Sequence, residues 1–227
     1  MSNPTSESSP GDVADTRPRW TRREIAQRLL ADIPDGWFVN LGIGMPTVLA
    51  DVTDSNREVV FHSENGIVGV GPYAAVEERD DDLINAGKDY VTVTKGAAFI
   101  SHCDSFGLIR GGHLDLAVMG AFQVAANGDF ANWKVPGSKI DAVGGAMDLS
   151  SGATRVWIMM DLFDRNGESK IQSRCTYQLT GCGVVERVYT DVAVFEITAA
   201  GVAVTEVAPL FGFDELQRRI PVQLRVA

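Results

Sequence analysis

The chain has 227 residues and carries 30 Asp and Glu against 20 Lys and Arg, a formal net charge of −10. This length favours one large domain, which can bury a sufficient core without disulfides or a structural metal. The acidic balance, with a pI near 4.7, argues against a surface that binds nucleic acid or anionic membranes. No apolar run reaches the roughly 18 residues that a membrane span requires.

Cysteine and histidine usage indicates reduced thiols and no metal centre. The three cysteines are an odd count without a CxxC pair, so neither a disulfide framework nor a zinc site is expected. We expect Cys175 and Cys182 to pack as small apolar residues and His102 to lie in a loop. No secretory signal is visible near the N-terminus. These features predict a soluble, cytoplasmic protein that binds no metal.

The chain divides into a tail and one folded domain. Residues 1–18 are dominated by Ser, Pro, Asp and Glu, so they lack the apolar surface that would offset ordering entropy, and we predict a disordered tail. Thr21 and Glu24 then have the spacing of a helix capping box, and apolar residues follow at helical intervals up to Ile33. We therefore place a single domain over residues 19–227.

Short apolar runs separated by glycine-rich turns predict buried strands at 37–41, 59–62, 90–94, 116–119, 156–160 and 192–197. The last run and 202–207 flank Gly201 and predict a hairpin, and 214–220 predicts a closing helix. Strands separated by helices or long loops are typical of a mostly parallel sheet covered on both faces. The predicted fold is therefore a three-layer αβα sandwich of the α/β class.

Four glycine-rich loops follow predicted strands, at 42–44, 63–66, 110–113 and 143–147. In an open α/β sheet, ligands bind beyond the carboxyl ends of the strands, so several of these loops are expected to converge on one crevice. A dinucleotide fingerprint is incomplete because position 47 is Thr, and no P-loop motif is present.

Glu64 lies in the segment FHSENGIVGVGP, directly after a predicted strand and inside a glycine-rich turn. One interpretation is a solvated turn residue, which is the usual place for a glutamate. The other is a carboxylate held at the mouth of a ligand crevice. A carboxylate is ionised at neutral pH and can act as a nucleophile without a partner base. This second interpretation fits a sequence that has no GxSxG motif and no evident Ser/His/Asp or Cys/His arrangement.

Residues 63–72 resemble the SENG signature of the class I 3-oxoacid CoA-transferases, specifically their B subunits. Seven further segments resemble family landmarks in the family's order: 40–46, 82–88, 110–115, 120–124, 128–133, 144–148 and 175–181. Segments 158–161, 166–170, 188–195 and 213–216 look most similar to the 3-oxoadipate branch, with the acetoacetate and succinyl-CoA:3-oxoacid branches as alternatives.

The resemblance implies that Glu64 attacks the thioester of an acyl-CoA and becomes a glutamyl-CoA thioester. The implied reaction moves CoA from succinyl-CoA to a 3-oxo acid, 3-oxoadipate in the most similar branch. CoA is then a substrate and covalent intermediate, and no tightly bound cofactor is expected. The resemblance also implies a partner chain, the family's A subunit, in an αβ unit that is commonly doubled.

The resemblance further implies supporting site residues. The backbone N–H groups of three residues are expected to stabilise the tetrahedral intermediates, with a fourth as a further candidate: Gly145, Ala146 and Met147, then Gly120. Three side chains match family positions that line the CoA and acid-substrate side: Asn40, Lys88 and Asn132.

Two other classes of function stay open at this stage. An acyl-CoA thioesterase on the same scaffold would release CoA without an acceptor acid. A non-catalytic binding subunit, or a relative with a sugar-phosphate isomerase-like fold, would not need Glu64, and the unbroken SENG turn argues against it.

Overall fold

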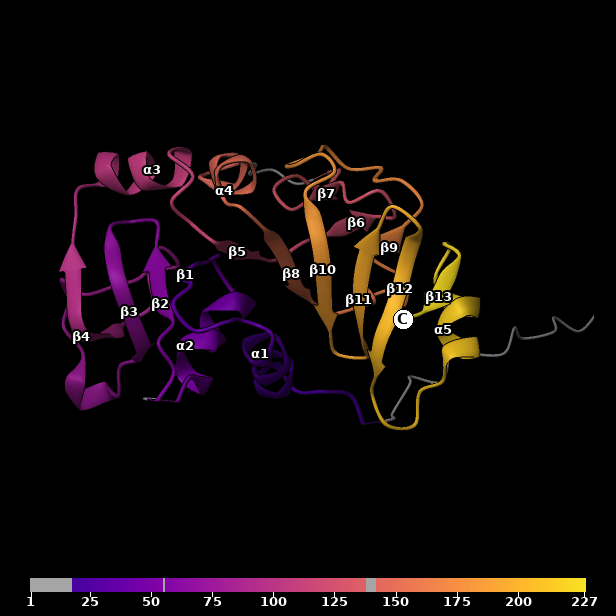
Figure 1. Cartoon of the computed structure of the whole chain (residues 1–227), viewed down its shortest axis with the longest axis horizontal. Helices are drawn as coiled ribbons and strands as arrows, with labels where there is room; N and C mark the ends of the chain where they lie inside the picture. The colour runs from indigo at the N-terminus through magenta and orange to yellow at the C-terminus, as the bar shows by residue number, and fades with distance from the viewer. Residues whose placement is uncertain (1–17, 55, 138–141) are drawn as a thin grey trace, which may run out of the picture.

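The computed structural model describes residues 18–54, 56–137 and 142–227 (Figure 1). Residues 1–17 of the predicted tail lie outside the described residues. One ten-stranded sheet runs through the molecule in the order β13-β12-β11-β10-β8-β5-β1-β2-β3-β4, and a small sheet has the order β7-β6-β9. β4 therefore lies at one edge of the large sheet and β13 at the other, as Figure 1 shows.

The strands of the large sheet are β1 (Phe38–Leu41), β2 (Val60–Ser63), β3 (Ile67–Tyr73), β4 (Val91–Phe99), β5 (Leu116–Met119), β8 (Val156–Met160), β10 (Val185–Thr190), β11 (Ala193–Thr198), β12 (Gly201–Val207) and β13 (Leu224–Val226). The small sheet contains β6 (Gln123–Ala125), β7 (Phe130–Ala131) and β9 (Ile171–Gln172). The helices are α1 (Arg22–Ala31), α2 (Val48–Val52), α3 (His102–Arg110), α4 (Ala146–Gly152) and α5 (Phe213–Arg219), with 3₁₀ turns η1 (Met45–Thr47) and η2 (Val76–Glu78).

The centre of the large sheet is parallel. β2, β1, β5, β8 and β10 pair in parallel, while β3 and β4 on one side and β11 and β12 on the other add antiparallel pairs. Every residue of β5 and β8 is buried, as expected for parallel strands covered on both faces. The predicted α/β class and the predicted hairpin around Gly201 are both confirmed.

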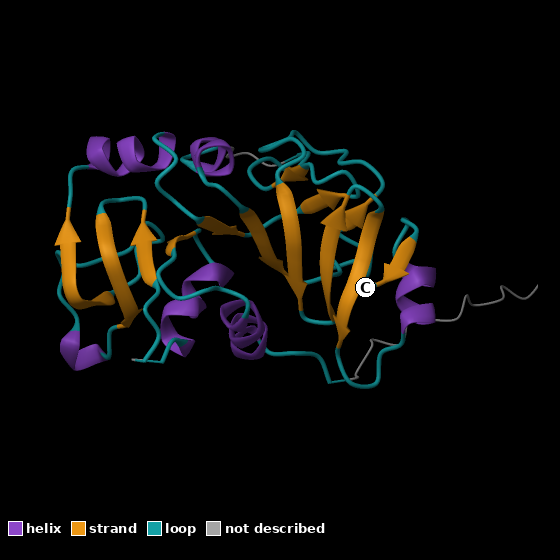
Figure 2. Cartoon of the chain, in the orientation of Figure 1, coloured by secondary structure: helices purple, strands orange, loops and turns teal. Residues whose placement is uncertain are grey.

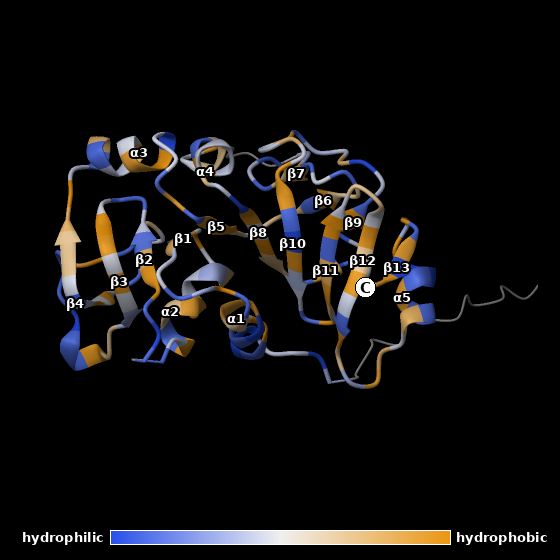
Figure 3. Ribbon diagram, in the orientation of Figure 1, coloured by the Kyte–Doolittle hydropathy of each residue, from blue (hydrophilic) through white to orange (hydrophobic). Residues whose placement is uncertain are grey.

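Alternating side chains of the central strands fill two cores. Leu116 and Val118 of β5 join a cluster with α1 and α2, whereas Ala117 and Met119 join a cluster with α3 and α4. Helices therefore cover both faces, and Figure 2 shows α1 and α2 on one side of the strands and α3 and α4 on the other. Figure 3 shows the matching pattern, with hydrophobic colour on β8 and both colours on α1, whose apolar residues are the buried ones.

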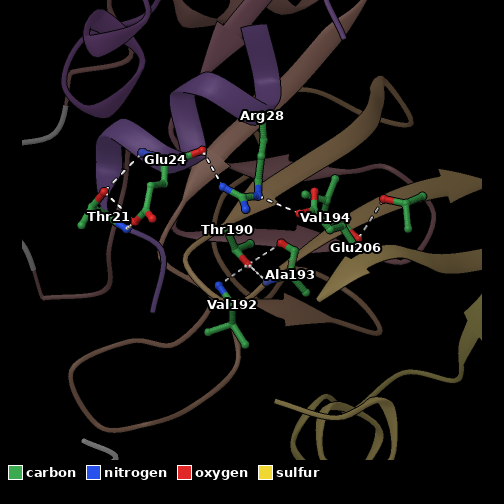
Figure 4. Close-up of polar contacts among 9 residues, drawn as sticks. Thr21, Glu24, Arg28, Thr190, Val192, Ala193, Val194 and Glu206 are labelled. Atoms are coloured by element: carbon green, nitrogen blue, oxygen red, sulfur yellow. Dashed lines mark hydrogen bonds and ion pairs between the residues drawn. The ribbon is translucent and has the colours of Figure 1, made fainter. Parts of the chain in front are cut away.

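Helix α1 begins as the sequence predicts. Thr21 accepts a hydrogen bond from the Glu24 N–H, and the Glu24 carboxylate accepts one from the Thr21 N–H, which completes the capping box in Figure 4. Arg28 in the last turn of this helix pairs with Glu206 of β12 at 2.9 Å. The cap fixes the first turn of α1, and the ion pair joins the helix to β12.

Three expectations differ from the structure. The glycine-rich segment after Glu64 continues as strand β3, because the glycines allow close approach of its neighbour β4. His102 is the first residue of α3 instead of a loop residue, since Ser101 caps that helix by accepting from the Asp104 N–H. Cys182 is exposed, so its expected apolar packing is wrong, and Cys175 is half-buried.

Candidate active site

Residues at or after the carboxyl ends of four parallel strands line one cavity of about 490 Å³. Gly42 follows β1, Glu64 follows β2, Gly120 follows β5 and Asp161 follows β8. Gly145, at the start of α4, completes this side of the cavity. Three of the four predicted glycine loops therefore converge, as expected at the carboxyl edge of an α/β sheet. The loop at 110–113 is not among the described residues that line it.

The turn that carries Glu64 is fixed by its backbone and its neighbours. Gly66 has φ +117°, and a Cβ there would overlap the Ile100 carbonyl oxygen, so this position requires glycine. The Asn65 amide donates to the Ile84 carbonyl at 2.7 Å, and the Ala86 N–H donates to the Ser63 hydroxyl at 2.9 Å. The loop before β4 thus holds both sides of Glu64.

Gly145 lies directly against the Glu64 carboxylate. A Cβ built on Gly145 would lie 2.5 Å from Glu64 Oε2 and 2.8 Å from Phe106 Cζ. Real Cβ atoms do not approach other atoms this closely, so the absence of a side chain at position 145 makes room for the carboxylate. The start of α4 and the end of β2 therefore meet at the carboxylate itself.

The surroundings of the Glu64 carboxylate shift its pKa in both directions. Burial raises its pKa above the usual range of a glutamate, nearby His102 acts in the opposite direction, and Asp148 raises the pKa further. Asp148 pairs with Arg110 at 2.7 Å, so part of its charge is compensated. No hydrogen bond or ion pair of the Glu64 carboxylate is found within the part of the chain that the structure describes. An unpaired, half-buried carboxylate with a raised pKa in a cavity is a functional-site signature.

The other predicted site residues fall into two groups. Gly120, Asn132, Gly145 and Ala146 line the cavity beside Glu64. The structure holds Asn132 in place, because its N–H donates to the Thr180 hydroxyl at 3.0 Å and its side-chain oxygen accepts from that hydroxyl at 2.7 Å.

Asn40, Lys88 and Met147 lie outside the cavity wall. Asn40 is only 1% exposed, and its amide contacts His62 on the neighbouring strand β2. Lys88 is an exposed turn residue with φ +69°, four residues beyond the Ile84 carbonyl that receives the Asn65 bond. The Met147 side chain is 41% exposed. The predicted contacts of these three residues with substrate stay predictions.

Sequence reasoning missed several residues around Glu64. His102 of α3 affects the Glu64 pKa, and Phe106 of the same helix lies beside Gly145, with the two rings 4.7 Å apart between centroids. Trp133 and Lys170 line the cavity, and both lie in or beside segments that resemble family landmarks. A helix cap at Ser101 was the available signal for α3, because Ser followed by Asp three residues later is a helix-start pattern.

Among the described residues, no group of three or more His, Cys, Asp or Glu side chains is arranged to hold a metal ion. None of the helices in the described part of the chain has the length and apolarity needed to cross a membrane.

Comparison with known proteins places the chain. The family described as Coenzyme A transferase matches residues 23–217. The chain is 54% identical over 205 residues to the B subunit of the 3-oxoadipate CoA-transferase of Pseudomonas putida, covering 90% of this chain and 96% of that protein. It is 42% identical to the B subunit of the succinyl-CoA:3-ketoacid coenzyme A transferase of Helicobacter pylori, covering 90% of this chain and 99% of that protein.

The fold agrees with this placement. The acyl-CoA transferase YdiF of Escherichia coli O157:H7 superposes with a TM-score of 0.72 at 19% identity, covering 96% of this chain and 44% of that protein. The chain thus spans less than half the length of YdiF. This likeness shows the fold, and the family match together with the B-subunit relatives shows the class. The chain belongs to the coenzyme A transferase family, and within it to the B subunits of class I.

Proposed function

We propose that this chain, together with a separate A subunit, transfers CoA from succinyl-CoA to a 3-oxo acid, with 3-oxoadipate as the preferred acceptor. The observation that carries the proposal is the Glu64 carboxylate, which stands unpaired in the cavity with Gly145 against it. The acceptor is inferred from the 54% identity to a protein named as the B subunit of a 3-oxoadipate CoA-transferase.

Glu64 is proposed as the nucleophile of a double displacement. Its carboxylate oxygen attacks the thioester carbonyl carbon, and the C–S bond breaks to give a mixed anhydride and free CoA thiolate. The thiolate attacks the glutamyl carbonyl, releasing succinate and leaving a glutamyl-CoA thioester. The carboxylate of the acceptor acid then attacks this thioester, and the same two steps in reverse order give the new acyl-CoA and free Glu64.

The tetrahedral intermediates of these steps need N–H donors. We propose the backbone of Gly145, Ala146 and Met147, with Gly120 as a further donor, because Gly145 is packed against the nucleophile. The Ala146 N–H donates to the Val143 carbonyl at 3.2 Å, so it reaches an oxyanion only if that bond is exchanged. No backbone partner of the Gly145 or Met147 N–H is found among the described residues.

Asn132, Lys88 and Asn40 are proposed on the CoA and acid side. The position of Asn132 on the cavity wall supports a direct role. A contact of Lys88 with substrate would require the 84–88 loop to face the partner chain or the bound acyl-CoA. A cytoplasmic location and an αβ unit, commonly doubled, complete the proposal and follow from the family alone.

Trapping the covalent intermediate tests this function. The enzyme with its A subunit, given succinyl-CoA and no acceptor acid, should carry CoA on Glu64. Hydroxylamine should convert it to a hydroxamate, and borohydride to an alcohol, and peptide mass mapping should find the change within residues 61–72. Glu64→Gln should abolish both trapping and transfer, whereas Glu77→Gln, at an exposed acid, should leave both intact.

Other outcomes contradict parts of the proposal. Modification of Cys103, Cys175 or Cys182 would make a thiol the nucleophile. Steady CoA release without an acceptor, at the rate seen with one, would make the enzyme a thioesterase. Transfer that prefers acetoacetate over 3-oxoadipate would overturn the acceptor and leave the mechanism standing.

A further inference from the structure

A buried chain of polar side chains runs behind the nucleophile. The Asn40 amide nitrogen lies 3.0 Å from His62 Nδ1, and His62 Nε2 lies 2.9 Å from the Ser105 hydroxyl. Ser105 in turn donates to the backbone carbonyl of Glu64 at 2.7 Å. His62 and Ser105 are fully buried and Asn40 is 1% exposed. Three elements, β1, β2 and α3, therefore connect to the residue that carries the carboxylate.

The donors and acceptors of this chain fit one arrangement. The Glu64 carbonyl can only accept, so the Ser105 hydroxyl must donate to it, and that hydroxyl then accepts from His62 Nε2–H. A neutral His62 with its proton on Nε2 leaves Nδ1 to accept from the Asn40 amide. Burial lowers the pKa of His62 to about 4, so the ring is neutral at pH 7 as this arrangement requires.

Packing alone gives no reason for these polar groups. They lie where the surrounding strands are apolar, and the Asn40 side-chain oxygen has no hydrogen-bond partner among the described residues. Burying a polar atom without a partner destabilises a fold, so such groups are expected mainly where function requires them. This series of hydrogen-bonded side chains ends at the Glu64 backbone carbonyl, which indicates that its function concerns Glu64.

We propose that Ser105, oriented by His62 and Asn40, is a positioning residue that fixes the Glu64 backbone so that its carboxylate faces the acyl thioester. The proposal rests on Glu64 being the nucleophile. Gly145, which has no side chain, makes room for the carboxylate, and the Ser105 hydroxyl ties the backbone carbonyl of the same residue to α3. Displacement of a reacting group by about 1 Å lowers rates up to about 100-fold, so the bond is expected to affect the chemical step rather than acyl-CoA binding.

The test compares Ser105→Ala with matched variants in the complete enzyme. The fraction of subunits that hydroxylamine modifies at Glu64 counts the active sites, and kcat and KM are expressed per active site. Ser105→Ala should lower kcat about 10- to 100-fold and slow the modification of Glu64 equally, with the KM for acyl-CoA within about twofold. His62→Leu should do the same, because Ser105 loses its donor.

Two conservative variants should rescue the rate. Ser105→Thr keeps the hydroxyl, and His62→Gln supplies an amide N–H that can donate to the Ser105 hydroxyl. Each variant should therefore retain kcat within about threefold of the wild-type enzyme. Thr190→Val is the control for the loss of a fully buried hydroxyl, since among the described residues the Thr190 hydroxyl bonds only to Val192 and Ala193, the contacts drawn in Figure 4. It should lower the melting temperature without lowering kcat per active site.

The proposal is overturned if Ser105→Ala keeps kcat per active site, or if the two conservative variants lose as much as Ser105→Ala and His62→Leu. It is also overturned if Thr190→Val reproduces the loss. Failure of the nucleophile assignment gives a different result, because the wild-type enzyme itself would then carry no hydroxylamine label on Glu64 during turnover. In that case the premise falls, and the positioning role falls with it.

Discussion

At the scale of single residues, the site depends on a carboxylate that is partly desolvated but not paired. Burial makes the charged form of Glu64 less favourable, while His102 offsets part of that effect. A paired carboxylate would be stabilised in its ground state and would be a poorer nucleophile. The same feature that supports chemistry should therefore destabilise the fold at neutral pH, and both effects can be measured.

The pH dependence of Glu64 follows from the direction of its shift. Only the carboxylate attacks a thioester, so the transfer rate should fall about tenfold per pH unit below a pKa that lies above that of an ordinary glutamate. For stability the sign is opposite. The folded state holds the proton more tightly than the unfolded state, so this group's contribution declines as pH rises from the ordinary pKa through the raised one.

Glu64→Gln should consequently raise the melting temperature at pH 7, by about 1–2 °C, and the gain should shrink below pH 4 where both proteins carry a neutral side chain. Thermal unfolding at both pH values, with Glu77→Gln as the exposed control, checks this. A lower melting temperature for Glu64→Gln at pH 7 would show that the carboxylate is stabilised in the fold.

Gly145→Ala should inactivate the enzyme while leaving it folded. The added Cβ would meet the end of the Glu64 side chain and the Phe106 ring. The flexible carboxylate can move aside at little energetic cost to the fold, but it then leaves its attacking position, so kcat should fall at least about 100-fold. Gly107→Ala in α3, where a Cβ meets nothing within 4 Å, is the control and should keep full activity. Equal kcat values for the two variants would contradict the prediction.

At this scale the sequence predicted several residues of the cavity but not the residues that pack around Glu64. Glu64, Gly120, Asn132, Gly145 and Ala146 were predicted and do share one cavity. The partners of Glu64 on α3 were not predicted, because a histidine and a serine some forty residues away carry no local signal of their contact with it. Only the packing of α3 across the end of β2 brings them there.

At the scale of elements, predictions held where a local pattern decides the structure. β5 and β8 match their predicted bounds, because continuous apolar runs are buried on both faces. β3 was missed because it contains Gly69 and Gly71, which weaken a strand pattern. A Cβ at Gly71 would lie 2.6 Å from the Thr92 hydroxyl, so the glycines serve close pairing with β4, a contact that no local pattern reveals.

The capping box of α1 provides an element-scale prediction. Thr21→Ala removes the side-chain acceptor of the Glu24 N–H and should lower the melting temperature by about 2–4 °C, with kcat unchanged. Gln27→Ala, at an exposed position inside the same helix, should leave the melting temperature unchanged or raise it. Thermal unfolding of both variants decides the matter, and equal values would mean that the cap contributes nothing to stability.

At the scale of the whole molecule, the strand order assembles the site. β1, β2, β5 and β8 are far apart in sequence, yet they lie side by side with their carboxyl ends at one edge. A sequence gives the strands and their turns but not their order in the sheet, so convergence of the glycine loops could be expected only from the general rule for α/β sheets.

The start of the folded domain yields the last prediction. Trp20 is 6% exposed, and its backbone N–H donates to the Asp191 carbonyl at 2.8 Å. The Arg28 guanidinium lies 3.8 Å from the centre of the Trp20 ring. Arg19 pairs with the Asp191 carboxylate at 2.9 Å. These contacts join the segment before α1 to the β10–β11 turn, so the fold needs the chain from Arg19 onward.

Removal of residues 1–18 should therefore leave the melting temperature within about 1 °C and the transfer rate unchanged, since their composition offers little apolar surface. Removal of residues 1–20 should lower the melting temperature by several degrees, because burial of a tryptophan side chain and its cation–π contact are lost together. Thermal unfolding and kinetics of the two truncated proteins, each paired with the A subunit, make the comparison. A large fall in melting temperature on removal of residues 1–18 alone would show that this segment makes contacts that its composition does not predict.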